Sequence, residues 1–278
     1  MPYIKSSDVE IFYILHKSYL PEKTESIILI HGAGGNHLSM LSIFNNLKKK
    51  YGTIFNILVF DLPFHFRSFA SDLENSLNQD LFKKNICGIT YYAEILNSIL
   101  SKIFDDNNHY ILIGHSMGAQ VCLKYASLFP YKTKKAMLIA GCHNTFISDS
   151  FIKSLEKSFE RTIILFLKDA LASKNKSIID KALTDIKRTN MQVVINDFKY
   201  SKYYVENYET DINVINRFGI FFNLIYSKND LIIREECMIE LHRKINSAII
   251  LQIPVKNHVD FLYDNYLMEK EIDKFLLT

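Results

Sequence analysis

One serine stands between two glycines at a point where the sequence pattern changes from strand-like to helical. In HYILIGHSMGAQVCLKYASLF, residues 109–129, an apolar run ends and an amphipathic helical pattern begins around Ser116. A serine at such an elbow projects its hydroxyl above the sheet, and the flanking Gly114 and Gly118 let strand and helix approach closely. The free N–H groups of the helix N-terminus lie beside it. We therefore predict that Ser116 is a nucleophile.

A serine hydroxyl is a weak nucleophile at neutral pH, so it needs a neighbouring base. After an elbow of this kind, an acid follows a late strand and a histidine follows the last strand. Asp230, in YSKND, and His258, in PVKNHVDF, follow the last two apolar runs and fit this order. His242 is the other histidine beyond Asp230, and its helical pattern indicates a surface or partly packed side chain. We therefore predict His258 as the base and Asp230 as the acid.

Three other acidic residues compete with Asp230. Asp149 and Asp211 also stand at loop edges, and Asp260 lies close to His258 in sequence. Asp211 precedes an apolar run that Asp230 follows, so it should lie at the opposite end of that strand. Asp149 would serve only if the acid followed the preceding strand. The three remain alternatives to Asp230.

Negative charge that develops on a carbonyl oxygen needs two preorganised donors. The backbone N–H of Met117, directly after the nucleophile, is available as the first donor. The stretch ILIHGAGGN, residues 28–36, offers the second, because its three glycines leave the backbone free to turn its amides inward. We predict the N–H of Ala33 for this position. The stretch lacks the glycine spacing and the lysine of a phosphate-binding loop, which argues against that alternative.

The elements that must position these residues follow an alternating order. Helical patterns separate six short apolar runs, at residues 26–31, 55–61, 110–115, 135–140, 219–227 and 248–254. Runs that are apolar on both faces are typical of a parallel sheet covered by helices. Two earlier stretches, YIK and VEIFYILHK, show partial alternation that fits an antiparallel hairpin at one edge. The pattern predicts an α/β fold with a doubly wound, mostly parallel sheet of about eight strands.

One interval breaks this order. Residues 143–216 contain helical patterns and no convincing buried strand. An all-helical insertion between two strands of such a sheet is expected to form a cap over the carboxyl ends of the strands, where ligands bind. An ordinary long crossover is the alternative, although a crossover helix needs only about a dozen residues. We predict a core of residues 1–142 and 217–278 and a helical cap of residues 143–216.

Composition narrows the class of protein. A chain of 278 residues with 48% apolar residues can bury a sizeable core, and its net charge of +3 comes without a basic tract, so nucleic acid is not an expected partner. We find neither a signal-peptide pattern nor the roughly 18 apolar residues of a membrane span, and we predict a soluble, cytoplasmic protein. The four cysteines lack paired spacing, so we expect neither a disulfide nor a structural metal. These cysteines are Cys87, Cys122, Cys142 and Cys237.

The motifs HGAGG, DLPFHFRS, GHSMGA, YSKND and NHVDF occur in the order typical of α/β-hydrolases, and this resemblance covers nearly all of the chain. The loop HGAGG together with GHSMG resembles monoacylglycerol lipases and related capped carboxylesterases. The resemblance implies that Ser116, Asp230 and His258 form a catalytic triad. It also implies that the N–H groups of Ala33 and Met117 form the oxyanion hole.

The chain departs from the family pattern in two places. Phe64 and Phe66 replace both glycines of the usual Asp-x-Pro-Gly-His-Gly-x-Ser. Phenylalanine does not relax into the positive φ open to glycine, so we expect a reshaped loop with an aromatic ring near the pocket. Met40 stands where tryptophan is common. We interpret Asp61 and His65, in the same loop as the phenylalanines, as structural.

These observations predict a serine hydrolase that cleaves small or medium, mainly apolar carboxylic esters through an acyl-enzyme, with no cofactor or metal. Acyl transfer, perhydrolysis and carbon–carbon bond hydrolysis are enzymatic alternatives, and a low-turnover ligand-binding receptor is an alternative of another class. The expected partner is a small-molecule ester, and the oligomeric state stays open. Several cap aromatics are candidates for an acyl pocket, although we expect most to be cap core: Phe146, Phe151, Phe159, Phe166, Phe198, Tyr200, Tyr203, Tyr204 and Tyr208.

Overall fold

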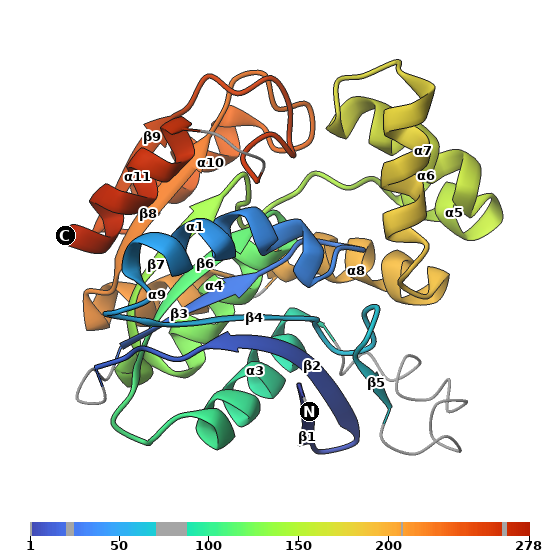
Figure 1. Ribbon diagram of the computed structural model, residues 1–278. Coiled ribbons are helices and arrows are strands. Elements are labelled where there is room, and N and C mark those ends of the chain that lie inside the picture. Colours follow the sequence, from blue (N-terminus) through green and yellow to red (C-terminus); the bar gives the residue numbers. More distant parts are fainter. Residues whose placement is uncertain (1, 21–24, 71–87, 207, 263–265) are drawn as a thin grey trace.

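A computed structural model describes residues 2–20, 25–70, 88–206, 208–262 and 266–278 (Figure 1). Within these ranges the chain forms a nine-stranded sheet. Eight strands follow one another across the sheet in the order β1 (Tyr3–Ser6), β2 (Val9–His16), β4 (Asn56–Phe60), β3 (Glu25–Ile30), β6 (His109–His115), β7 (Thr133–Ile139), β8 (Phe221–Tyr226) and β9 (Ala248–Gln252). The short β5 (Phe69–Ala70) pairs with β2.

Strand directions match the sequence prediction. All pairings from β4 to β9 are parallel, whereas β2 runs antiparallel to both β1 and β4. The predicted doubly wound, mostly parallel sheet is therefore confirmed, and so is the antiparallel hairpin at its edge. No helix within the described residues is long and apolar enough to cross a membrane.

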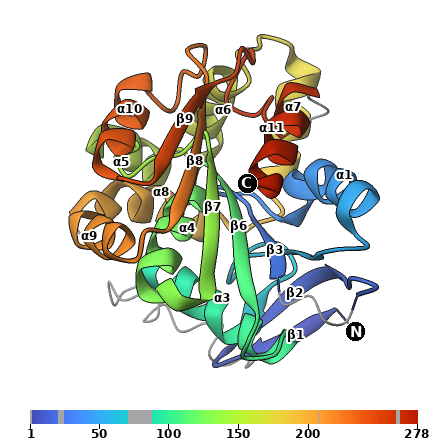
Figure 2. The same cartoon turned by 90° about the vertical axis from the view of Figure 1, so that its left-hand side faces the viewer.

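Helices cover both faces of the sheet because the central strands are apolar on both sides (Figures 1 and 2). Alternate residues of β3 show this: Ile28 and Ile30 belong to one buried cluster, and Ile27 and Leu29 to another. The first cluster includes α3 (Ile89–Ile103), α4 (Met117–Leu128), α9 (Tyr208–Phe218) and α10 (Glu235–Lys244). The second includes α1 (Leu41–Tyr51) and α11 (Tyr266–Leu277). Short 3-10 turns are η1 (His37–Met40), η3 (Pro130–Lys132) and η4 (Tyr204–Glu206).

A helical insertion separates β7 from β8. It contains α5 (Asp149–Lys157), α6 (Phe159–Ala170), α7 (Lys176–Ile186) and α8 (Met191–Tyr203), and Figure 1 draws α5 to α7 apart from the sheet. These four helices share a hydrophobic cluster of their own, built around Leu155, Ile163 and Phe198. The following α9 packs on α4 and contributes to the core cluster instead. The division at residues 143 and 216 stays a prediction.

The loop after β4 has positive φ at both phenylalanines that replace the glycines of the usual motif. Phe64 has φ 68° and Phe66 has φ 39°, so the expectation that phenylalanine forces this backbone out of positive φ was wrong. Positive φ costs a side chain roughly 1–2 kcal/mol, and ring contacts offset it. Phe66 stacks on His37 with centroids 5.8 Å apart and lies 5.2 Å from the guanidinium of Arg188, while Phe64 stacks on Tyr91 at 6.5 Å.

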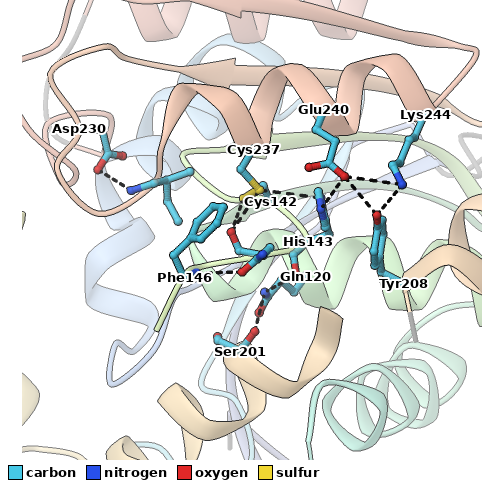
Figure 3. Close-up of a disulfide and its surroundings, with 12 residues drawn as sticks. Gln120, Cys142, His143, Phe146, Ser201, Tyr208, Asp230, Cys237, Glu240 and Lys244 are labelled. Carbon is cyan, nitrogen blue, oxygen red and sulfur yellow. Dashed lines mark hydrogen bonds and ion pairs between the residues drawn. A yellow bond between two sulfur atoms is a disulfide. The ribbon is translucent and has the colours of Figure 1, made fainter. Parts of the chain in front are cut away.

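Two cysteines that lie far apart in sequence form a disulfide (Figure 3). Cys142 follows β7 and Cys237 lies in α10; their Cα atoms are 6.2 Å apart although 95 positions separate them. The prediction that the chain contains no disulfide was wrong. The reason is that sequence spacing does not report that β7 and β8 are neighbours, which brings α10 against the end of β7. Cys122 is buried and free, and Cys87 lies outside the described residues.

Reducing the Cys142–Cys237 bond is expected to lower the free energy of unfolding by about 2–5 kcal/mol, because the bond restricts the unfolded chain by closing a long loop. Urea unfolding with and without a phosphine reductant, after thiol titration has confirmed reduction, measures this difference. The double variant Cys142→Ala/Cys237→Ala is the control, and its unfolding midpoint should not respond to reductant. Equal midpoints for oxidised and fully reduced wild type would contradict the expectation.

Candidate active site

Ser116 occupies the single position between β6 and α4, with φ 55° and ψ −120°. This backbone conformation is sparsely populated for serine and is typical of a strained nucleophile elbow. The glycines beside it are required by backbone contacts. A Cβ atom at Gly114 would overlap the carbonyl of Gly118, and one at Gly118 would overlap the carbonyl of Ile30. The half-buried Ser116 is therefore held where β6, α4 and the end of β3 meet.

Asp230 and His258 form a buried pair at the same edge of the sheet. The Nδ1 of His258 lies 2.8 Å from the Oδ2 of Asp230, and the side chains of both residues are almost completely buried. The other carboxylate oxygen accepts the N–H groups of Ile232 at 2.8 Å and Ile233 at 3.0 Å. Burial alone would raise the pKa of Asp230, but the imidazole and these two N–H groups hold it below its ordinary value. The carboxylate is therefore ionised at neutral pH.

The three alternative acids lie elsewhere. Asp149 forms an ion pair with a lysine of α8. Asp211 is buried in an ion pair with a lysine of α4, and Asp260 accepts a backbone N–H of its own loop. Among the four acids considered, Asp230 is the one that hydrogen-bonds to His258.

The glycine-rich loop after β3 packs directly on the elbow. A Cβ atom at Gly32 would lie 3.0 Å from the Cβ of Ser116, so the loop backbone borders the serine side chain. The N–H of Gly35 donates to the carbonyl of Gly32 at 3.0 Å, which closes the turn. Within the described chain, the N–H groups of Ala33 and Met117 make no hydrogen bond. Two backbone donors therefore remain available beside Ser116.

Two further histidines support this arrangement and were not singled out from the sequence. Burial is the main cause that lowers the pKa of His115 to about 3, and the neighbouring His258 lowers it as well. The Nε2 of His115 donates to the carbonyl of His258 at 2.9 Å. Burial also lowers the pKa of His31 to about 4. Neutral His31 accepts the N–H of Leu62 at 3.0 Å and donates to the carbonyl of Gly32 at 2.9 Å. Both therefore hold backbone groups as uncharged side chains. The available sequence signal was the place of His31 within HGAGG and of His115 directly before Ser116.

Ser116 and His258 line one pocket of about 510 Å³ between the sheet edge and the insertion. Its wall is mainly apolar, and four of the nine candidate cap aromatics contribute to it: Phe146, Phe151, Phe166 and Phe198. Neither Phe64 nor Phe66 lines this pocket.

In the described part of the chain, Ser116 and His258 are not hydrogen-bonded to each other. Catalytic hydrogen bonds often form fully only with substrate present.

The described residues contain no group of three or more histidine, cysteine, aspartate or glutamate side chains that could hold a metal ion.

Comparisons with known proteins agree with this fold. The profile of the alpha/beta hydrolase fold family matches residues 25–234. A Mycoplasma genitalium protein named provisionally as esterase/lipase 2 is 24% identical over 241 residues, which cover 85% of this chain and 83% of that protein. A carboxylesterase structure from Nitrososphaera gargenis has a TM-score of 0.78 at 17% identity and covers 99% of this chain and 98% of its own. The enol-lactonase of Burkholderia xenovorans LB400 has a TM-score of 0.79 at 12% identity and covers 100% of both chains. Since the family profile spans most of its length, the chain belongs to the alpha/beta hydrolase fold family.

Proposed function

We propose that the protein is a serine esterase that cleaves small or medium, mainly apolar carboxylic esters. The observation that carries this proposal is that Ser116, at a strained elbow, lines one apolar pocket with His258, which is bonded to the ionised Asp230. The similarity to a provisionally named esterase/lipase and to carboxylesterase structures supports the same class of reaction.

The proposed reaction uses the same three side chains in both half-cycles. Asp230 accepts the Nδ1–H of His258, so the lone pair of Nε2 is free to take the proton of Ser116. The serine oxygen attacks the ester carbonyl, and the N–H groups of Ala33 and Met117 stabilise the oxyanion. His258 then protonates the leaving alcohol, and water releases the acyl group in the second half-cycle.

The apolar pocket wall supports the proposal that the enzyme recognises its substrates by an apolar acyl group. Phe151, Phe166 and Phe198 pack against one another with centroids 5.1–6.0 Å apart and present rings from α5, α6 and α8. Burying each methylene of an acyl chain against such a wall is favourable by about 0.8 kcal/mol. We propose that the insertion acts as a cap that selects acyl chain length.

Three other reactions are alternatives to ester hydrolysis. Acyl transfer, perhydrolysis and carbon–carbon bond hydrolysis would use the same three side chains, so product identification separates them from ester hydrolysis.

The cytoplasmic location stays a prediction, and the Cys142–Cys237 bond argues against it, because disulfides persist mainly in oxidising compartments.

Replacing Ser116 with alanine is expected to abolish both ester turnover and labelling by a fluorophosphonate, since the hydroxyl is the proposed nucleophile. The loss in rate should be about 10⁴- to 10⁶-fold. Hydrolysis of p-nitrophenyl esters and mass spectrometry of the labelled peptide measure the two effects. Circular dichroism checks that the variant is folded. Labelling that persists at another serine would refute the assignment.

Asp230→Asn is expected to lower turnover about 10⁴-fold, because an amide holds His258 in the wrong tautomer. Asp149→Asn and Asp211→Asn are the matched controls, and both should keep turnover near the wild-type value under the same conditions. Steady-state kinetics of the three variants on one ester decide the question. Wild-type turnover in Asp230→Asn, with collapse in either control, would move the acid to another residue.

Phe166→Ala is expected to shift the ester preference toward longer acyl chains, because it removes a ring from the pocket wall. A change of one methylene in a pocket is worth about 10- to 200-fold in kcat/KM, so the shift should be readily measurable. Leu165→Ala is the control on the same helix, since Leu165 is 54% exposed and does not line the pocket. An identical chain-length profile in folded Phe166→Ala and wild type would count against the cap as the acyl site.

A further inference from the structure

A fully buried carboxylate joins the insertion to the glycine-rich loop. Asp197, in α8, accepts three hydrogen bonds. Its Oδ2 accepts the N–H of Gly34 at 2.8 Å and the Nε2–H of His65 at 2.8 Å, and its Oδ1 accepts the hydroxyl of Tyr92 at 2.8 Å. A buried carboxylate is costly unless it is paired and hydrogen-bonded, and Asp197 meets both conditions.

The partner of this carboxylate is a charged histidine. Both ring nitrogens of His65 face acceptors, Nε2 toward Asp197 and Nδ1 toward the carbonyl of Pro63 at 3.0 Å, so both carry protons. Burial alone would lower the pKa of His65, but Asp197 and the Pro63 carbonyl hold it above its ordinary value. Asp61 and the ring of His31 also face His65. The result is an ion pair, and an ionised acceptor makes a stronger bond to the Gly34 amide.

The bond to Gly34 fixes the loop that carries the Ala33 amide. Gly34 has φ +63°, and a Cβ atom there would lie 3.1 Å from a methyl group of Val194, so α8 packs directly on the loop. Asp197 orients the Gly34 N–H, and the carbonyl of Gly32 orients the next N–H. Both of these donors are engaged, whereas the Ala33 N–H has no hydrogen-bond partner within the described residues.

We propose that Asp197 is a positioning residue that holds the oxyanion loop from the insertion, so that the oxyanion hole is formed when α8 packs on the loop. This inference rests on the proposed function of Ser116 and of the Ala33 and Met117 amides. Asp197 touches no reacting atom, and it acts through the Gly34 peptide. Losing its acceptor should therefore weaken stabilisation of the transition state and leave binding of the ester unchanged.

Asp197→Ala is expected to lower kcat about 10- to 100-fold, somewhat less than outright loss of an oxyanion donor, with KM within about twofold of wild type. Asp197→Asn should retain kcat within a few fold. Its amide oxygen can still accept the Gly34 N–H, and its NH₂ group can donate to the Tyr92 hydroxyl. Asp197→Leu, which fills the space without an acceptor, should match Asp197→Ala and replaces it if the alanine variant does not fold.

Two ligands separate positioning from a purely structural role. An alkyl trifluoromethyl ketone forms a tetrahedral oxyanion on Ser116, so its affinity should fall in Asp197→Ala by the same factor as kcat/KM. The unreactive amide with the same alkyl chain should bind equally to wild type and variant. A general loosening of the pocket would weaken both ligands alike.

Two variants serve as matched controls. Tyr92→Phe removes a donor from the other oxygen of Asp197 and leaves the bond to Gly34 in place. Asp211→Asn alters a second buried carboxylate, whose partners are Lys124 and Tyr204. Both should keep kcat and trifluoromethyl ketone affinity near wild type, even if their unfolding midpoints fall.

The deciding experiment measures kcat, KM and both affinities for wild type, Asp197→Ala, Asp197→Leu and Asp197→Asn. A fall in kcat and ketone affinity that Asn rescues supports the proposal. Wild-type kcat in a folded Ala or Leu variant overturns it, and so does an equal loss of ketone and amide binding. Wild-type protein that neither hydrolyses esters nor reacts with fluorophosphonate overturns the proposed function itself, a result distinct from the other two.

Discussion

The close approach of β6, α4 and β3 around Ser116 is the constraint on which the rest of the site depends. The chain must leave a central strand and enter a helix within one residue, and two glycines permit this because side chains there would overlap backbone carbonyls. The resulting strain at Ser116 is held by strands that are buried on both faces. The same geometry puts the N-terminus of α4, with the Met117 amide, beside the serine.

Parallel strands bring the remaining groups to the same edge. Asp230 follows β8 and His258 follows β9, and because these strands run in the same direction as β6, their loops converge near Ser116. Burial then differentiates the ionisable groups. Burial keeps His115 and His31 neutral, and each donates a hydrogen bond to a backbone carbonyl. Asp230 stays ionised because an imidazole and two amides compensate for its burial.

The insertion is tied to the sheet by contacts of different chemistry. The Cys142–Cys237 bond anchors the segment that leaves β7 to α10, which begins shortly after the loop of Asp230 (Figure 3). The ion pair of Asp197 with His65 attaches α8 to the loops after β3 and β4. The ring of Phe66 meets Arg188 beyond α7, which helps to hold a loop with unfavourable φ values. Packing of the insertion and the shape of the site are therefore coupled.

The sequence by itself determined the class of fold, the elbow at Ser116 and a chain order in which an acid and then His258 follow the serine. These features rest on local periodicity, on glycines at fixed offsets and on the order of strands, all of which are readable along one dimension. Only the tertiary structure decided which acid meets His258, which cysteines pair and which cap aromatics line the pocket. It also decided that Phe64 and Phe66 keep positive φ, because packing across the fold outweighed their local preference. Asp197 lies within an ordinary helical pattern, and its contact with Gly34 spans 163 positions. Such contacts depend on how elements distant in sequence meet in space, which neither composition nor spacing records.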